Sequence, residues 1–219
     1  MYNRRTYKAF PFAFLIHRKT FIPATFPSPF PAHQGLVYPL VRRWPASYDV
    51  IALSAGAAMP DFVDIVFGFL LNGYFRHWFA HSLVFIPFNI LGGLLLTWLI
   101  KVSISKLFKK ENSVDQNNTG NGKSRLNIWT FSVTVGVLSH LGFDLISHDV
   151  NLLLYPWVED VRWLPDWWYA SWYVIQPPLS MGPPYSIGFH SLVWLILSTL
   201  GTFLFYQFVF EKIKHVWKR

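Results

Sequence analysis

The chain has 219 residues, of which 53% are hydrophobic and 19% aromatic, and only 14% are charged. In soluble domains about a quarter of all residues are charged, so the composition of this chain indicates a membrane protein. The chain has no cysteine, which excludes disulfides and thiolate metal sites and leaves His, Asp and Glu as metal ligands. Despite a net charge of +8, nucleic acid is not an expected partner, because the basic residues lie in loops beside apolar segments.

The N-terminal third is predicted to contain one short helix. Residues 1–30 form a segment rich in proline and aromatic residues, which disfavours a regular helix. A helix is expected from His33 to Arg43, where Trp44-Pro45 ends it. It spans only about 16 Å, too short to cross a membrane. Ser47 is the expected N-cap of the next helix.

The first membrane segment is predicted at Val50–Leu71. It contains two acids, Asp61 and Asp64, next to Pro60. We therefore expect the helix to be interrupted near Pro60, with both acids facing protein and not lipid. The tight turn before this segment would bring His33 back beside Asp61.

Three further segments reach the roughly 20 apolar residues that crossing a membrane requires: Leu83–Ile100, Ile128–Ser147 and Gly188–Phe210. The expected fold class is therefore all-α. We predict a multi-pass helical membrane protein with about four membrane-embedded helical segments plus a short N-terminal helix. Residues 1–219 would form a single membrane domain.

The basic residues orient these segments. Six Lys and Arg lie in the polar loop 101–127 and four in the C-terminal tail EKIKHVWKR, so both are expected in the cytoplasm. The loop 149–187 is expected on the extracytoplasmic side. Within it, the aromatic run 155–173 is interpreted as an interfacial belt, since Trp and Tyr prefer the headgroup level. The alternative interpretation is that this aromatic run forms a binding platform.

The stretch GVLSHLGFDLISHD, residues 136–149, carries His140, Asp144 and His148 at four-residue intervals. On a helix these side chains share one face. The spacing H-x-x-x-H at 77–81 similarly places two imidazoles together. At about 1.5 Å per residue, the polar side chains of three segments lie roughly 22 to 33 Å from the cytoplasmic basic residues. We therefore expect one shared site near the extracytoplasmic boundary.

Imidazole and carboxylate groups together suit Zn²⁺ or another first-row divalent ion. A carboxylate within a membrane helix costs about 2.5–3.5 kcal/mol and is rarely kept without a partner, so the acids are the stronger candidates. For His190 a hydrogen bond between helices is the favoured interpretation, and for His148 the two interpretations are equal. The full candidate set is His33, Asp61, Asp64, His77, His81, His140, Asp144, His148 and His190.

Four stretches, PFPAHQGL, AGAAMPDFVD, RHWFAHS and SHLGFDLISHDVNLLLYPW, occur in that order over roughly residues 28–157. They resemble the signature of predicted inner-membrane metal-dependent hydrolases, the LexA-regulated type and its uncharacterised relatives. That family is in turn similar to the zinc-dependent phospholipase C superfamily. The resemblance implies a bacterial inner-membrane location and one or two divalent ions, by this analogy zinc. The implied metal ligands are His33, Asp61, His81, His140 and Asp144.

The chain departs from these patterns at two places. The family usually has HRGxTHS, and with His81 matched to its last histidine, Arg76 stands in place of the first histidine and His77 in place of the arginine. Secreted zinc phospholipases carry a later His-x-x-x-Glu, whereas no Glu stands four residues after His190. Arg76, His77, His148 and His190 are therefore additional candidates for the site, ranked below the five implied ligands.

These features together favour a metal-dependent hydrolase that acts at the extracytoplasmic face. Its substrate would be a phosphoester, either a lipid-linked one or an envelope intermediate. The lipid membrane is its environment. Asp64, one turn beyond Asp61, is the expected general base. One alternative is a transporter or ion-binding membrane protein that uses the same His/Asp cluster as a cation or proton path. Another is a non-catalytic membrane scaffold.

Overall fold

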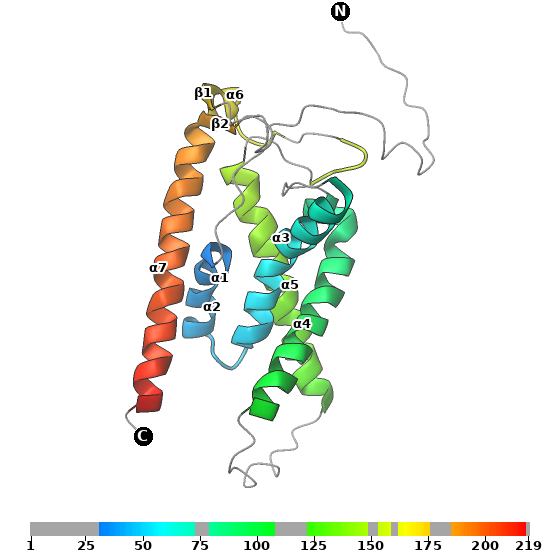
Figure 1. Cartoon of the computed structure of the whole chain (residues 1–219), viewed down its shortest axis with the longest axis vertical. Helices are drawn as coiled ribbons and strands as arrows, with labels where there is room; N and C mark the ends of the chain where they lie inside the picture. Colours follow the sequence, from blue (N-terminus) through cyan, green and yellow to red (C-terminus); the bar gives the residue numbers. More distant parts are fainter. Residues whose placement is uncertain are drawn as a thin grey trace, which may run out of the picture.

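The computed structural model describes residues 31–72, 79–107, 122–148, 153–158, 162–175 and 185–217. Most of the described chain is helical, and the long helices run side by side (Figure 1). The helices are α1 (Ala32–Leu36), α2 (Tyr38–Arg43), α3 (Val50–Asn72), α4 (Ile86–Leu107), α5 (Gly122–Ser147), α6 (Asp166–Tyr169) and α7 (Phe189–Trp217), with the 3-10 turns η2 (Phe79–His81) and η3 (Leu83–Phe85). Two antiparallel strands, β1 (Ser171–Ile175) and β2 (Tyr185–Gly188), separate α6 from α7. The all-α prediction is confirmed.

In the described part of the chain, four helices are long and apolar enough to cross a membrane. Their apolar stretches are Val50–Phe67, Leu83–Lys106, Arg125–Ser147 and Phe189–Glu211, which correspond to the four predicted segments. Large apolar side chains remain exposed on their outer faces, for example Leu91 on α4, which is 64% exposed. Such faces suit contact with lipid tails and not with water.

The start of α3 differs from the prediction. The helix begins at Val50, and its cap is Asp49, because the backbone N–H of Ala52 donates to Asp49 Oδ1 over 3.0 Å. Ser47 lies outside the helix, so the cap predicted from it is wrong. The other oxygen of Asp49 accepts a hydrogen bond from Lys101 Nζ at 2.6 Å. This ion pair joins the start of α3 to the last turns of α4.

The predicted interruption at Pro60 is also wrong, since α3 continues through this residue. A proline removes one backbone donor from the helix ladder, and membrane helices tolerate this when neighbouring groups satisfy the backbone. One turn before Pro60, the carbonyl oxygen of Ala57 lies 2.7 Å from Nδ1 of His140 on α5. A side chain from the neighbouring helix therefore supports the backbone of α3 beside the proline.

The short helix predicted before α3 is divided at Val37 into α1 and α2. Pro39 accounts for the division, because it lacks the N–H that a continuous helix would need there and instead occupies the first turn of α2. The hydroxyl of Tyr38 donates to Glu211 Oε2 at 2.9 Å, and Arg42 lies 3.9 Å from the other oxygen of Glu211. These contacts fix α2 against the C-terminal part of α7.

Two close helix crossings set the positions of the site residues. Gly35 on α1 faces Gly201 on α7, and a Cβ on Gly35 would overlap the backbone of Gly201. Gly136 on α5 is also packed closely against the backbone of Leu53 on α3. Small residues let membrane helices approach until their backbones touch. His33 and His140 lie within a few residues of these crossings, so both are brought into the bundle.

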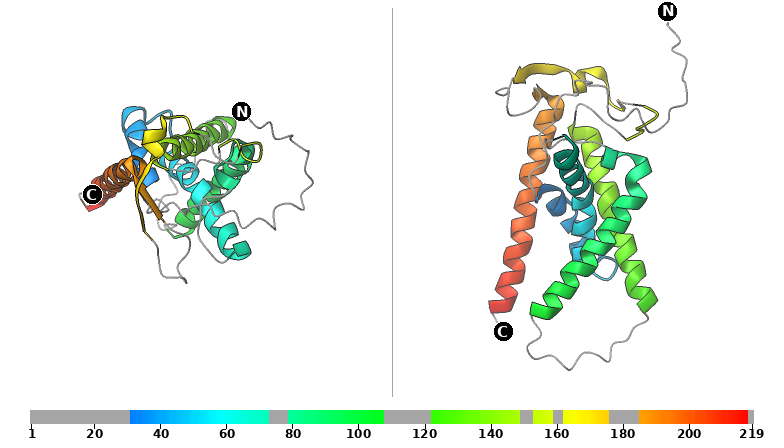
Figure 2. Two further views of the ribbon diagram at one scale, coloured as in Figure 1. Left: turned by 90° about the horizontal axis from the view of Figure 1, so that it is seen from above. Right: turned by 45° about the vertical axis from the view of Figure 1, so that its right-hand side comes forward.

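The end of the bundle opposite the C-terminus is covered by α6, β1 and β2 (Figures 1 and 2). The indole N–H of Trp168 donates to the carbonyl oxygen of Ile146 on α5 at 2.9 Å, and its ring packs against Phe189 at the start of α7. Other aromatic side chains here are exposed, including Trp163 at 62% and Trp172 at 64%. The small aromatic cap therefore connects α5 to α7, and its predicted role as an interfacial belt stays a prediction.

Candidate metal centre

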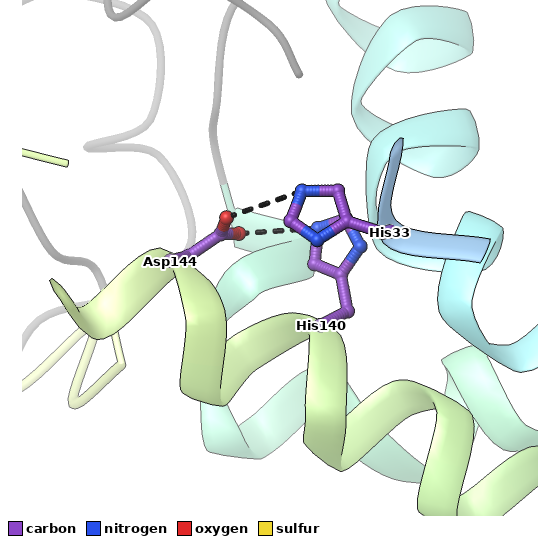
Figure 3. Close-up of side chains that lie close together, drawn as sticks. All are labelled: His33, His140 and Asp144. Atoms are coloured by element: carbon purple, nitrogen blue, oxygen red, sulfur yellow. Dashed lines mark ion pairs between the residues drawn. The ribbon is translucent and has the colours of Figure 1, made fainter. Parts of the chain in front are cut away.

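Four elements, α1, α3, η2 and α5, bring the predicted polar residues together inside the bundle. Figure 3 shows the side chains of His33, His140 and Asp144 converging from α1 and α5. The complete cluster consists of His33 from α1, Asp61 and Asp64 from α3, His81 from η2, His140 and Asp144 from α5, and His148 just beyond α5.

At the centre of the cluster, His81 and His140 point their Nε2 atoms at each other over 3.0 Å. The opposite nitrogen of each ring is held by an acceptor. Nδ1 of His140 contacts the carbonyl oxygen of Ala57, and Nδ1 of His81 lies 2.7 Å from Asp64 Oδ2. Each Nδ1 therefore carries the hydrogen, and in the neutral rings both Nε2 atoms present lone pairs.

Two carboxylates point at the same place as these lone pairs. Asp144 Oδ2 lies 3.1 Å from Nε2 of both His81 and His140. Asp61 Oδ1 lies 3.5 Å from the first and 3.6 Å from the second. The two carboxylates stabilise a positive charge beside the rings, either a proton on an imidazole Nε2 or a bound metal ion. These His and Asp groups could hold a metal ion.

The second oxygen of Asp144 faces two more histidines. Asp144 Oδ1 lies 3.2 Å from Nε2 of His148 and 3.6 Å from Nε2 of His33. The rings of His33 and His140 are stacked with their centroids 4.0 Å apart (Figure 3). His148, for which the sequence left two interpretations open, thus lies in the cluster. Whether it binds a metal stays a prediction.

Asp64 occupies a different place from the other acids. Its Oδ2 contacts the Nδ1 of His81, the nitrogen that faces away from the centre, and its Oδ1 accepts from the backbone N–H of Ala80 at 3.1 Å. The side chain is almost completely buried. The general-base role expected from the sequence stays a prediction, but these bonds favour a positioning role for Asp64.

Asn89 is a supporting residue that sequence reasoning missed. It is fully buried in α4, and its Nδ2 donates to the carbonyl oxygen of Ala80 at 2.7 Å. This bond holds the turn that presents His81. The sequence did contain a signal for Asn89, because it is a polar amide in the otherwise apolar run LVFIPFNILGG.

The environment sets the charge of the histidines outside the spanning helices. Burial lowers the pKa of His33 to about 3, with a smaller contribution from the neighbouring His140, so this ring is neutral and can act as a ligand. Burial also lowers the pKa of His81, but hydrogen bonds to Asp144, Asp61 and Asp64 together hold it well above its usual value. A cation is thus favoured beside His81, either a proton or a metal ion that replaces it.

A family model described as the YdjM inner membrane protein matches residues 32–214, which include the whole cluster. The chain belongs to the YdjM inner membrane protein family. No curated protein and no solved structure matches it. Together with the four apolar helices, the family identifies an integral protein of the bacterial inner membrane. The resemblance is thus confirmed for the membrane family, and its hydrolase and phospholipase C parts stay predictions.

The remaining candidate residues of this YdjM-family chain lie elsewhere. Arg76 and His77 are outside the described residues. His190 is buried at the start of α7, where its ring lies against Gly188 of β2, and its role stays a prediction. A small cavity beside His33 is bordered by Ser198 of α7, which is about 13 Å along the helix from its first residue.

Proposed function

We propose that this YdjM-family chain is a metal-dependent membrane hydrolase that cleaves a phosphoester. The observation that carries the proposal is the convergence of the His81 and His140 lone pairs with the carboxylates of Asp144 and Asp61. A bound cation accounts for that arrangement.

The chain's own groups would hold the ion and fix its orientation. Asp64 and the carbonyl oxygen of Ala57 keep the hydrogens of His81 and His140 on Nδ1, so each Nε2 stays available. A divalent ion held there would polarise a phosphoryl oxygen and make a coordinated water more acidic. Asp61 has the most accessible carboxylate of the cluster's ion pairs, with 19% of its side chain exposed, so a substrate would approach on its side.

The position of the cluster favours a substrate that resides in the membrane. Most residues of the cluster are buried within the helical bundle. A lipid-linked phosphoester places its phosphate close to the outer ends of the helices, near the depth of the cluster. We therefore infer a lipid or envelope phosphoester as the substrate class, with the active site facing the extracytoplasmic side.

Metal content and hydrolysis test the proposal together. Protein purified in detergent is expected to contain at least one equivalent of Zn²⁺, Mn²⁺ or Fe by elemental analysis, and to release phosphate or alcohol from a phospholipid in mixed micelles. The H140A/D144A double variant should lose both properties, because it removes two of the converging groups. Asp166→Asn, an exposed carboxylate of the cap, is the matched control and should keep both.

A cation or proton path is the second candidate function. It is favoured by the unbroken contacts from His81 through Asp144 to His148, since buried His and Asp chains relay protons in transporters. If the purified protein shows no hydrolysis, but proteoliposomes show a cation-dependent flux that Asp144→Asn abolishes, this function replaces the hydrolase. Retention of metal in the H140A/D144A variant would separate the cluster from any metal site.

A further inference from the structure

His33 is buried with one ring nitrogen that no described protein group satisfies. Only 5% of the residue is exposed, and neither of its nitrogens makes a hydrogen bond with a described residue. Nε2 faces Asp144 Oδ1 over 3.6 Å, whereas Nδ1 has no hydrogen-bond or ion-pair partner within the described part of the chain. A buried polar atom of this kind is costly unless a group from outside the protein supplies the bond.

The missing partner must suit either form of the ring. If Nε2 binds a metal ion, Nδ1 carries the hydrogen and needs an acceptor. If Nε2 carries the hydrogen, Nδ1 has a lone pair and needs a donor. A water molecule or a hydroxyl group can do both, because its oxygen donates as well as accepts.

A small cavity lies beside His33, where α1, α5 and α7 meet. The centre of a water molecule can occupy about 10 Å³ of it, which is room for one water but not for a phosphate group or a lipid chain. Two buried hydroxyls share the cavity wall with His33, Ser147 at the end of α5 and Ser198 on α7. None of the described residues in the wall is acidic, which disfavours a cation there.

The walls of the cavity are held in place by the close crossing of α1 and α7. Gly35 and Gly201 meet at this crossing, with His33 two residues before the first glycine and Ser198 three residues before the second. Because the two backbones already touch, the helices cannot move closer to fill the cavity. The imidazole and the two hydroxyls thus surround a fixed space, and a water needs two to four such polar partners.

We propose that this cavity binds one water molecule, held by Nδ1 of His33 and the hydroxyls of Ser147 and Ser198, and that this water positions His33 as a metal ligand. The positioning role rests on the proposed metal-dependent function, whereas the water site itself does not. In this arrangement Ser147 and Ser198 are positioning residues, because they act on the cluster through the water and through His33.

The water would connect α7 to the cluster. Among the described side chains, α7 contributes none to the ion pairs of the cluster, but Ser198 would reach His33 through the water. The cavity is lined from α1, α5 and α7, whereas Asp61, on whose side a substrate would approach, belongs to α3. The water and the substrate would therefore lie on different sides of the cluster.

Radiolytic labelling of the protein in lipid nanodiscs tests for the water directly. An X-ray pulse converts water into hydroxyl radicals, which oxidise the side chains that touch that water. In the wild type we expect labelling of Phe143 and Trp194, which line the cavity, and none of Phe203, a lipid-facing aromatic on α7. Ser198→Val, which removes the hydroxyl and fills the space, should lose this labelling. Thr199→Val, a similar change at the exposed neighbouring position, should keep it.

Metal affinity tests the positioning role. Ser198→Val should bind Zn²⁺ roughly 10- to 100-fold more weakly than the wild type in competition with a chelator, as on loss of a group that orients a ligand, and Thr199→Val should bind it equally well. An affinity that is unchanged in a Ser198→Val variant without the labelling would overturn the positioning role.

Equal labelling of Phe143, Trp194 and Phe203 in the wild type, or labelling of the first two that persists in Ser198→Val, would overturn the water site. The wild-type comparison decides this even if the variant folds poorly. Failure of the hydrolase proposal gives a different result, because a protein with labelled cavity residues and no hydrolysis keeps the water site.

Discussion

The orientation of two histidine rings decides what the cluster can bind. Asp64 holds the Nδ1 of His81, and a backbone carbonyl holds the Nδ1 of His140. A metal-binding histidine commonly donates its other N–H to a carboxylate or a carbonyl, which fixes both the ring and its tautomer. The two inner acids of α3 therefore have different tasks, although they are only three residues apart. Asp61 faces the converging nitrogens, and Asp64 supports one of the rings.

Replacing Asp64 by asparagine tests this division. The amide oxygen can still accept from the N–H of Ala80, but the amide nitrogen cannot accept from the Nδ1–H of His81. We expect metal affinity to fall roughly 10- to 100-fold, measured by competition with a chelator. If Asp64→Asn instead binds metal as the wild type does and loses only turnover, Asp64 is the general base that the sequence first suggested.

The sequence predicted the four spans and the shared helix face of His140 and Asp144, but not the local details of the elements that carry the cluster. Four-residue spacing places His140 and Asp144 on one face of α5, and this follows from helix geometry alone. The task of Asp64 could not be predicted in this way, because it depends on η2, a turn with no periodic pattern. Hydropathy located the four spans, but it could not show that α3 continues through Pro60, since the support for its backbone comes from His140 of another helix.

At the scale of the elements, the crossing of α3 and α5 holds the two halves of the cluster together. Gly136 lies at that crossing, one turn before His140, and a Cβ there would overlap the carbonyl oxygen of Leu53. Gly142 lies on the same helix with open space where a Cβ would be. The pair provides a matched comparison, because both glycines have helical neighbours on each side.

We expect Gly136→Ala to destabilise the protein by about 1–3 kcal/mol and to lower its metal content, because the helices must separate to fit the methyl group. Gly142→Ala should be neutral or slightly stabilising, since alanine favours a helix more than glycine does. Thermal unfolding in detergent, followed by circular dichroism, and elemental analysis measure both effects. Equal behaviour of the two variants would show that the crossing does not determine the site.

For the whole molecule, the two ends of the bundle differ in chemistry. Lys101 lies in the last turns of α4, Arg125 in the first turn of α5, and Arg42 beside Glu211 in the C-terminal part of α7. These ends of the helices lie together, whereas α6, β1 and β2 lie at the other end of the bundle (Figures 1 and 2). The ion pair with Asp49 neutralises only Lys101, whereas the loop 101–127 and the C-terminal tail carry ten Lys and Arg in the sequence. Basic ends of membrane helices remain in the cytoplasm.

This asymmetry predicts the side of the membrane on which the site works. A reporter fused after Arg219 and another inserted after Asn118 should both report the cytoplasm, because the loop 101–127 and the C-terminal tail hold ten Lys and Arg together, six and four respectively. Along α5, His140 of the cluster lies about 22 Å from Arg125, at the start of the helix. A substrate would then reach it from the extracytoplasmic half of the membrane. Periplasmic activity of either reporter would reverse the orientation, and the cluster would then have to act on a substrate from the cytoplasmic half.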